Sequence, residues 1–125
     1  MPIRWEVDHP QKLLRVTGEG TVTLKDVELY LDQIVTAGAM PYAKLFDATK
    51  VDPQYTDHDI MMLAARMSAY RATLKGGSLA FVVADGPVFE AVQRYINLAP
   101  AERAVAVFPT VPEAQAWLAA HPKVD

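Results

Sequence analysis

The sequence contains no cysteine, and this absence removes several kinds of chemistry. Without thiols the chain forms no disulfide and offers no thiolate as a nucleophile or a metal ligand. Its three histidines, His9, His58 and His121, are widely separated and lack the spacing of a zinc site. We therefore predict that the protein has no metal site and needs no cofactor.

Positive charge and long apolar runs are also scarce. Twelve Lys and Arg residues stand against fifteen Asp and Glu residues, with a formal net charge of -3 and no basic stripe. This balance argues against a nucleic-acid partner. The longest apolar runs, such as residues 104–109, are shorter than the ~20 residues of a membrane span, and the first residues lack a signal-peptide core. We therefore expect a cytoplasmic protein with no membrane span.

What the sequence does have is the composition of an ordinary globular domain. It has 125 residues, of which 51% are hydrophobic and 22% charged. A chain of this length buries roughly two-thirds of its unfolded surface on folding. No repeat, low-complexity tract or linker interrupts it, and residues 49–55, which include Pro53, have the composition of a loop. We predict a single domain over residues 1–125.

Strand-like and helix-like segments alternate along the chain. Apolar and β-branched residues at 3–7 and 13–17 flank a polar segment, which predicts an antiparallel hairpin that ends where Gly18-Glu19-Gly20 breaks the pattern. Thr23 and Asp26 form a capping box for a first helix that Gly38 ends. Further strands are expected at residues 42–48, 79–83 and 104–108. Helices are expected at residues 57–74 and 88–98. A last helix begins at the Thr110–Glu113 capping box and ends near residue 120.

This alternation determines the expected fold class. Apolar strands that alternate with helices are typical of parallel strands whose sheet is covered on both faces. We therefore predict an α/β domain with a mixed, mostly parallel β-sheet in the order ββαβαβαβα.

Polar residues follow the third expected strand, at the sheet edge where ligands of open α/β folds gather. They are Asp47, Thr49, Thr56, Asp57 and His58. One interpretation is a phosphate or phospho-acceptor site. The favoured one is structural, with Thr56 as the helix N-cap, Asp57 complementing the helix dipole and Asp47 accepting bonds from loop amides.

We find no catalytic set in the sequence. No serine, cysteine or second histidine is placed at a spacing that would complete a catalytic triad with His58. We predict that the protein is not an enzyme and has no catalytic residue.

The second helix carries more apolar residues than one core stripe needs. Its core stripe consists of Ile60, Leu63, Met67 and Leu74. The residues left at other angles are Met61, Met62, Ala64 and Ala65. Two explanations stay open. A neighbouring loop covers the surplus, or the surplus forms an adaptable contact surface for another chain or an apolar ligand, a use that suits methionine.

The order of elements, with a polar loop leading into the Thr56 helix, resembles the STAS domain of SpoIIAA-like anti-sigma-factor antagonists. Residues 39–47 and 59–67 look like a proteobacterial SpoIIAA-like branch of unsettled function. In the antagonists a strand-end aspartate precedes a helix start whose serine is phosphorylated by a kinase. Here Asp47 matches the aspartate, and Thr56-Asp57-His58-Asp59 replaces the helix start without a serine. The resemblance thus implies Thr56 as the candidate phospho-acceptor.

The resemblance and the residues together support two functional hypotheses. The first is a non-enzymatic regulatory or protein-interaction module. It would dock through the loop before the second helix and the start of that helix, and a homodimer is one form of this docking. Its expected surface consists of Asp47, Thr49, Asp57, His58, Met61, Met62 and Ala65. The alternative follows from a similarity to lipid-binding domains of the CRAL-TRIO type. It is a small-molecule or lipid carrier with an apolar pocket beside the sheet, lined by Met61, Met62, Phe89 and Tyr95.

Overall fold

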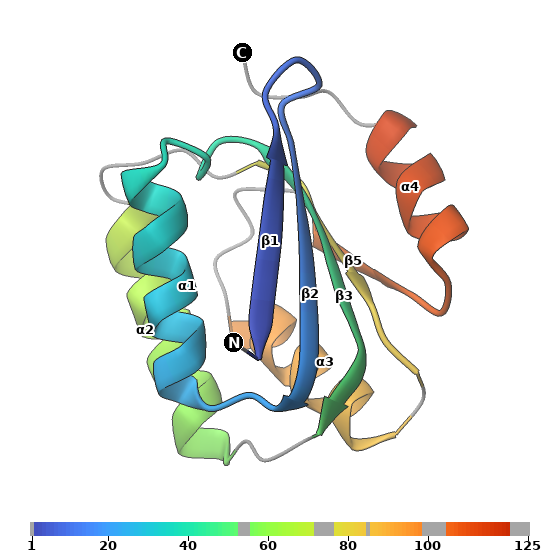
Figure 1. The fold of residues 1–125 in the computed structure, drawn as a ribbon. Helices are drawn as coiled ribbons and strands as arrows, with labels where there is room; N and C mark the ends of the chain where they lie inside the picture. Colours follow the sequence, from blue (N-terminus) through green and yellow to red (C-terminus); the bar gives the residue numbers. More distant parts are fainter. Residues whose placement is uncertain (1, 53–55, 72–76, 85, 99–104, 121–125) are drawn as a thin grey trace.

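The structure is a computed structural model that describes residues 2–52, 56–71, 77–84, 86–98 and 105–120 (Figure 1). Strands and helices follow one another in the predicted order ββαβαβαβα. The elements are β1 (Ile3–Asp8), β2 (Leu13–Thr21), α1 (Leu24–Thr36), β3 (Ala43–Asp52), α2 (Asp57–Arg71), β4 (Leu79–Val82), α3 (Pro87–Leu98), β5 (Val105–Phe108) and α4 (Val111–Ala120). The expected extension of the second helix to residue 74 lies outside the described residues.

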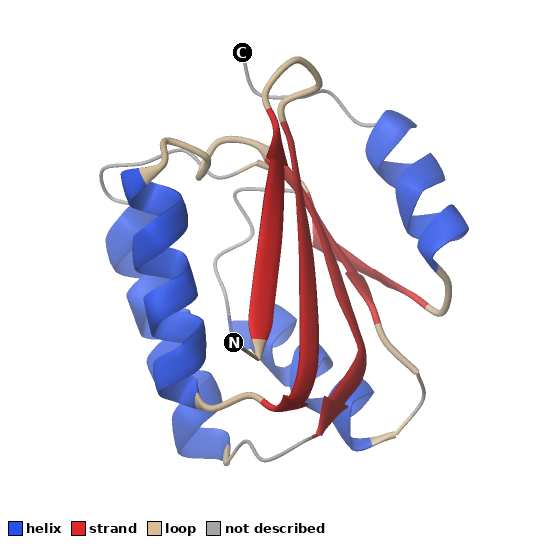
Figure 2. Ribbon diagram, viewed as in Figure 1, coloured by secondary structure: helices blue, strands red, loops and turns tan. Residues whose placement is uncertain are grey.

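The strands form one sheet in the order β1-β2-β3-β4-β5 (Figure 2). β1 and β2 are antiparallel, as expected for a hairpin, and the other neighbouring pairs are parallel. Each parallel pair is joined by a helix, because a parallel connection must return the chain to the starting edge of the sheet. The predicted α/β class with a mostly parallel mixed sheet is confirmed.

Helices lie on both faces of the sheet, but unequally. α1, α2 and α3 pack against one face, and α4 packs against the other (Figure 1). Successive side chains of β3 point alternately to one face of the sheet and to the other, as in any strand. Lys44 and Phe46 face the three helices, whereas Ala43 and Leu45 belong to the smaller core under α4. The larger core therefore lies between the sheet and α1, α2 and α3.

The glycines at positions 18 and 20 do not end the second strand, and this corrects the prediction. β2 continues to Thr21 and pairs with the end of β3, with a register irregularity between Thr17 and Glu19. A Cβ atom at Gly18 would lie 2.7 Å from Cγ2 of Val51, so the close approach of the two strands requires glycine there. The segment Gly18-Glu19-Gly20, which the sequence analysis read as a break, is part of a strand with a bulge.

The partner strand is correspondingly longer than predicted. Residues 49–52, expected in a loop, belong to β3, and the rest of the expected loop, residues 53–55, lies outside the described residues. Parallel pairing with the extended β2 supplies backbone hydrogen bonds to this segment. The segment is therefore a strand, although its polar residues are typical of a loop.

The predicted caps are confirmed. Thr23 Oγ1 accepts a hydrogen bond from the Asp26 amide at 3.2 Å, and an Asp26 carboxylate oxygen accepts one from the Thr23 amide at 2.9 Å. Gly38, just past α1, has a φ of 73°, a conformation that glycine adopts without strain. At the start of α4, Thr110 Oγ1 accepts from the Glu113 amide at 3.4 Å. These local signals position the helices over the sheet.

Candidate functional site

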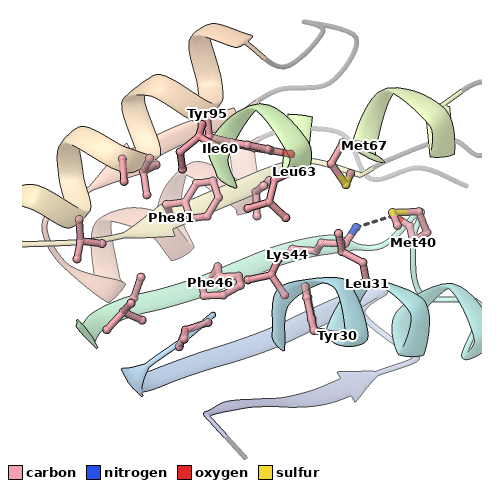
Figure 3. Close-up of a pocket in the computed structure, with 18 residues that line it drawn as sticks. Tyr30, Leu31, Met40, Lys44, Phe46, Ile60, Leu63, Met67, Phe81 and Tyr95 are labelled. Carbon is pink, nitrogen blue, oxygen red and sulfur yellow. Dashed lines mark hydrogen bonds between the residues drawn. The ribbon is translucent and has the colours of Figure 1, made fainter. Parts of the chain in front are cut away.

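A partly enclosed cavity of about 120 Å³ lies between the sheet and the helices α1, α2 and α3 (Figure 3). Its walls come from β3, β4, these three helices and the segments that precede and follow α1, and they are almost entirely apolar. The lining residues are Val22, Val27, Tyr30, Leu31, Met40, Lys44, Phe46, Ala48, Val51, Ile60, Leu63, Met67, Leu79, Phe81, Val88, Ala91, Val92 and Tyr95.

The helix that covers the cavity is α2. Ile60, Leu63 and Met67 have the i, i+3 and i+7 spacing of one helix face, and all three point into the space between α2 and the sheet (Figure 3). On the opposite walls, Ala48 and Ala91 are buried residues with short side chains. The cavity is the space that the side chains of these walls leave unfilled.

Aromatic rings form a continuous wall across the cavity. Tyr30 of α1 meets Phe46 of β3 at a centroid distance of 5.9 Å, and Phe46 meets Phe81 of β4 at 5.7 Å. Phe81 in turn meets Tyr95 of α3 at 6.3 Å. The edge-to-face and tilted geometries are favourable for aromatic pairs, so the wall is a well-packed surface.

Lys44 is the one charged residue among the lining residues that the structure describes. It is 3% exposed. Its Nζ donates hydrogen bonds to the main-chain carbonyl oxygens of Met40 at 2.5 Å and of Tyr42 at 2.9 Å. These bonds offset part of the cost of removing an ammonium group from water. Sequence reasoning missed Lys44, although a lysine between Ala43 and Leu45 in an apolar strand was a signal that could have identified it.

A polar network joins α1 to α2 beside the cavity. Arg66 donates to Asp32 at 2.9 Å and to Glu28 at 3.4 Å, and the Tyr70 hydroxyl also donates to Asp32. The hydrogen bonds from Tyr70 and Arg66 hold the pKa of Asp32 below its ordinary value. The bond to Asp32, together with burial, raises the pKa of Tyr70. Near neutral pH Asp32 is therefore charged and Tyr70 neutral, the states in which the network is complete.

Asp47 and Thr49, which the sequence analysis placed at a ligand-binding edge of the sheet, form hydrogen bonds with each other. An Asp47 carboxylate oxygen accepts hydrogen bonds from the Thr49 amide at 3.0 Å and from the Thr49 hydroxyl at 2.7 Å. Asp47 also lies between Phe46 and Ala48, both of which line the cavity, so strand alternation turns its side chain to the other face of the sheet. The structural interpretation accounts for both residues.

The start of α2 has the geometry of a capped helix. Thr56 Oγ1 accepts from the Asp59 amide at 3.1 Å, and an Asp59 carboxylate oxygen accepts from the Thr56 amide at 3.1 Å. Asp57 forms a salt bridge with Arg94 at 3.2 Å, and His58 is exposed. Thr56 acts as the N-cap, as the structural interpretation held. Phosphorylation of Thr56 stays a prediction.

The surplus apolar residues of α2 lie on its outer side. Met61 is 58% exposed and Met62 is 44% exposed, and Ala65 is exposed as well. The explanation in which a neighbouring loop covers the two methionines is therefore wrong. Ala64, in contrast, is buried.

The predicted carrier pocket lies beside the sheet as expected, but with a different lining. Of the four residues named for it, Tyr95 lines the cavity, while Met61, Met62 and Phe89 do not. The reason is the helical period. With Ile60 and Leu63 turned inward, residues 61 and 62 point about 100° and 200° away from Ile60.

Neither a metal cluster nor a membrane-spanning helix is found among the described residues. Within them, no group of three or more His, Asp or Glu side chains is placed to hold a metal ion. None of the helices in that part of the chain combines the length and apolarity needed to cross a bilayer.

Comparison with known proteins identifies the fold. No protein-family model matches the sequence, and no curated protein matches it either. Among solved structures, the chain is similar to an uncharacterized protein of the DUF3478 family, with a SpoIIAA-like fold, from Shewanella loihica PV-4. The similarity has a TM-score of 0.59 at 20% sequence identity and covers 93% of each chain. The protein therefore has a SpoIIAA-like fold, as the order of its elements and the resemblance to STAS domains had indicated.

Proposed function

We propose that this domain is a non-enzymatic binding module that holds a small, mainly apolar molecule in the cavity under α2. The observation that carries the proposal is a partly enclosed space of about 120 Å³ with almost wholly apolar walls. Ligand sites in proteins are concave and mostly apolar, with few polar groups to orient the ligand. The cavity has this character, and Lys44 is its charged group.

The volume limits the size of the ligand. An engineered apolar cavity of roughly 150 Å³ stays dry and binds benzene, so the present cavity has room for about six carbon atoms. A long-chain lipid is too large for this space. The proposal therefore narrows the small-molecule or lipid carrier hypothesis to small ligands.

A direct test is a titration of the protein with 1-hexanol followed by two-dimensional NMR. Burial of a six-carbon chain contributes about 0.8 kcal/mol per methylene, which corresponds to a dissociation constant on the order of 0.1–1 mM. We expect saturable shifts of the signals of Leu63 and Val92, which line the cavity, and little change at Leu118 in the core under α4. Shifts that fail to saturate, or that are as large at Leu118, would contradict the proposal.

A second candidate function is docking through the outer side of α2, which is the regulatory or interaction role suggested by the sequence. The observation that favours it is the exposure of two adjacent large apolar side chains, Met61 and Met62. Adaptable methionines are common at interaction surfaces. The partner is a second copy of the chain, the homodimer that the sequence analysis named as one form of docking.

Sedimentation velocity over a range of protein concentrations tests this candidate. We expect a dimer that forms as the concentration rises and that disappears in the double variant Met61→Lys/Met62→Lys, because two charges would have to be buried in the contact. Leu29→Lys is the matched control, since Leu29 is 46% exposed on α1. A monomer at every concentration, or a dimer that the double variant leaves intact, rules out self-association through this surface.

A further inference from the structure

The aromatic side chains in the cavity wall indicate which class of apolar molecule the cavity holds. We propose that the ligand is a compound built on a single six-membered aromatic ring, which lies against the rings of Phe46 and Phe81. This inference rests on the proposed function and adds the ligand class. It is carried by two phenylalanines that keep accessible surface although they lie in the middle of the sheet, under three helices.

Phe46 and Phe81 have open surface where a closely packed core leaves almost none. They lie on β3 and β4, which are interior strands of the sheet, and they face α1, α2 and α3. Two positions along these strands on the same face, Ala48 and Leu79 are buried, whereas the two phenylalanines are only partly buried. Because both phenylalanines line the cavity, their open surface faces it. A phenylalanine side chain is a ring on one methylene group, so the surface offered to a ligand is mainly aromatic.

The rings of the wall stand at different angles to one another (Figure 3). Phe46 and Phe81 are tilted by 40°. Tyr30 is nearly perpendicular to Phe46, at 86°, and Tyr95 is at 78° to Phe81. Aromatic rings attract one another in edge-to-face and offset arrangements, because their faces are negative and their edges positive. An aromatic ligand gains these contacts in addition to burial, whereas an aliphatic ligand gains burial alone.

Two methionines and the size of the cavity favour the same class of ligand. Met40 and Met67 also line the cavity, and methionine makes favourable sulfur contacts with aromatic rings. The volume of about 120 Å³ is close to that of an engineered apolar cavity of roughly 150 Å³ that binds benzene. One six-membered ring therefore fits the cavity, and a pair of fused rings is too large for it.

The experiment compares benzene with cyclohexane in NMR titrations of the wild-type protein. Both molecules have six carbon atoms, and burial alone favours cyclohexane, because its additional hydrogen atoms give it more apolar surface. Contacts with aromatic rings act in the opposite direction, and one such pair typically contributes roughly 2- to 12-fold in affinity. We expect benzene to bind at least about fivefold more tightly than cyclohexane.

Phe81→Met tests the ring itself, because it removes the ring and keeps an apolar side chain. We expect the affinity for benzene to fall at least about fivefold and the affinity for cyclohexane to change less than about twofold. Phe108→Met is the matched control, since Phe108 is also partly buried but packs in the core under α4, and it should behave as wild type. A Phe81→Met variant that keeps its affinity for benzene and gains affinity for cyclohexane would show that cavity size sets the preference, which overturns the inference.

The outcomes separate the ligand class from the proposed function. Cyclohexane binding as tight as that of benzene, or binding of 1-hexanol alone, overturns the aromatic ligand and leaves the binding module standing. Failure of benzene, cyclohexane and 1-hexanol to bind overturns the binding module as well. If circular dichroism shows that Phe81→Met is unfolded, intermolecular nuclear Overhauser effects in the wild-type protein replace the variant. Benzene protons should then show these effects to the ring protons of Phe46 and Phe81, and their absence contradicts the proposed placement.

Discussion

Ala91→Leu is expected to abolish the binding of 1-hexanol. Ala91 lies on α3, is 5% exposed and lines the cavity, so a leucine there places three more carbon atoms in the space that the ligand would occupy. Because the cavity holds only about six carbon atoms, the remaining volume is too small for the alcohol. We expect an affinity at least about a hundredfold lower, which corresponds to about 3 kcal/mol and is measured by the same NMR titration.

The fold should tolerate this change. Leucine is nearly as good a helix former as alanine, and filling a cavity offsets part of the strain that a larger side chain introduces. Ala116→Leu is the matched control, since Ala116 is exposed on α4, on the other side of the sheet. This control should bind 1-hexanol as the wild type does. Undiminished binding by a folded Ala91→Leu variant would show that the alcohol binds elsewhere.

Leu14→Ala is expected to cause the largest loss of stability. Leu14 lies on β2, is 0% exposed and belongs to the core between the sheet and the three helices. Truncation of a fully buried leucine removes its transfer free energy and leaves a cavity, at a cost of about 2–5 kcal/mol. Since domains of this kind unfold with about 5–15 kcal/mol, a loss of this size is a large fraction of the total stability.

Urea denaturation measures this loss. The midpoint should fall while the dependence of the free energy of unfolding on urea stays unchanged, because the surface exposed on unfolding is nearly the same. Leu29→Ala is the control, since Leu29 is 46% exposed on α1, and its effect should stay within about 0.5 kcal/mol. A cost below about 1 kcal/mol for Leu14→Ala would mean that this part of the core rearranges or is packed differently.

The order of elements and the helix starts were accessible from the sequence because their signals are local. The capping residues Thr23 and Asp26 lie within one helical turn, so the pattern and the structure coincide there. The hairpin of β1 and β2 is likewise formed by neighbouring segments. The order of strands and helices also carried the resemblance to STAS domains, and the structure has the SpoIIAA-like fold that this resemblance implied.

The strand that continues through Gly18 and Gly20 shows where local reasoning fails. The two glycines look like a turn, but their segment is held in the sheet by pairing with residues 50–52, more than thirty positions farther along the chain. Val51 comes so close to Gly18 that a side chain at position 18 would collide with it. Such a contact depends on the approach of two strands, and no pattern within either segment reports it.

The sequence by itself determined the fold class, the helix caps and the surplus of apolar residues on α2. It did so because hydrophobic periodicity and capping act within a few residues of one another. Only the tertiary structure decided that Met61 of this surplus stays exposed, that a cavity lies under Leu63, and that Lys44 is buried in the wall of that cavity. A cavity is the space that residues from several distant segments fail to fill, so its existence, volume and charge depend on how those segments pack together.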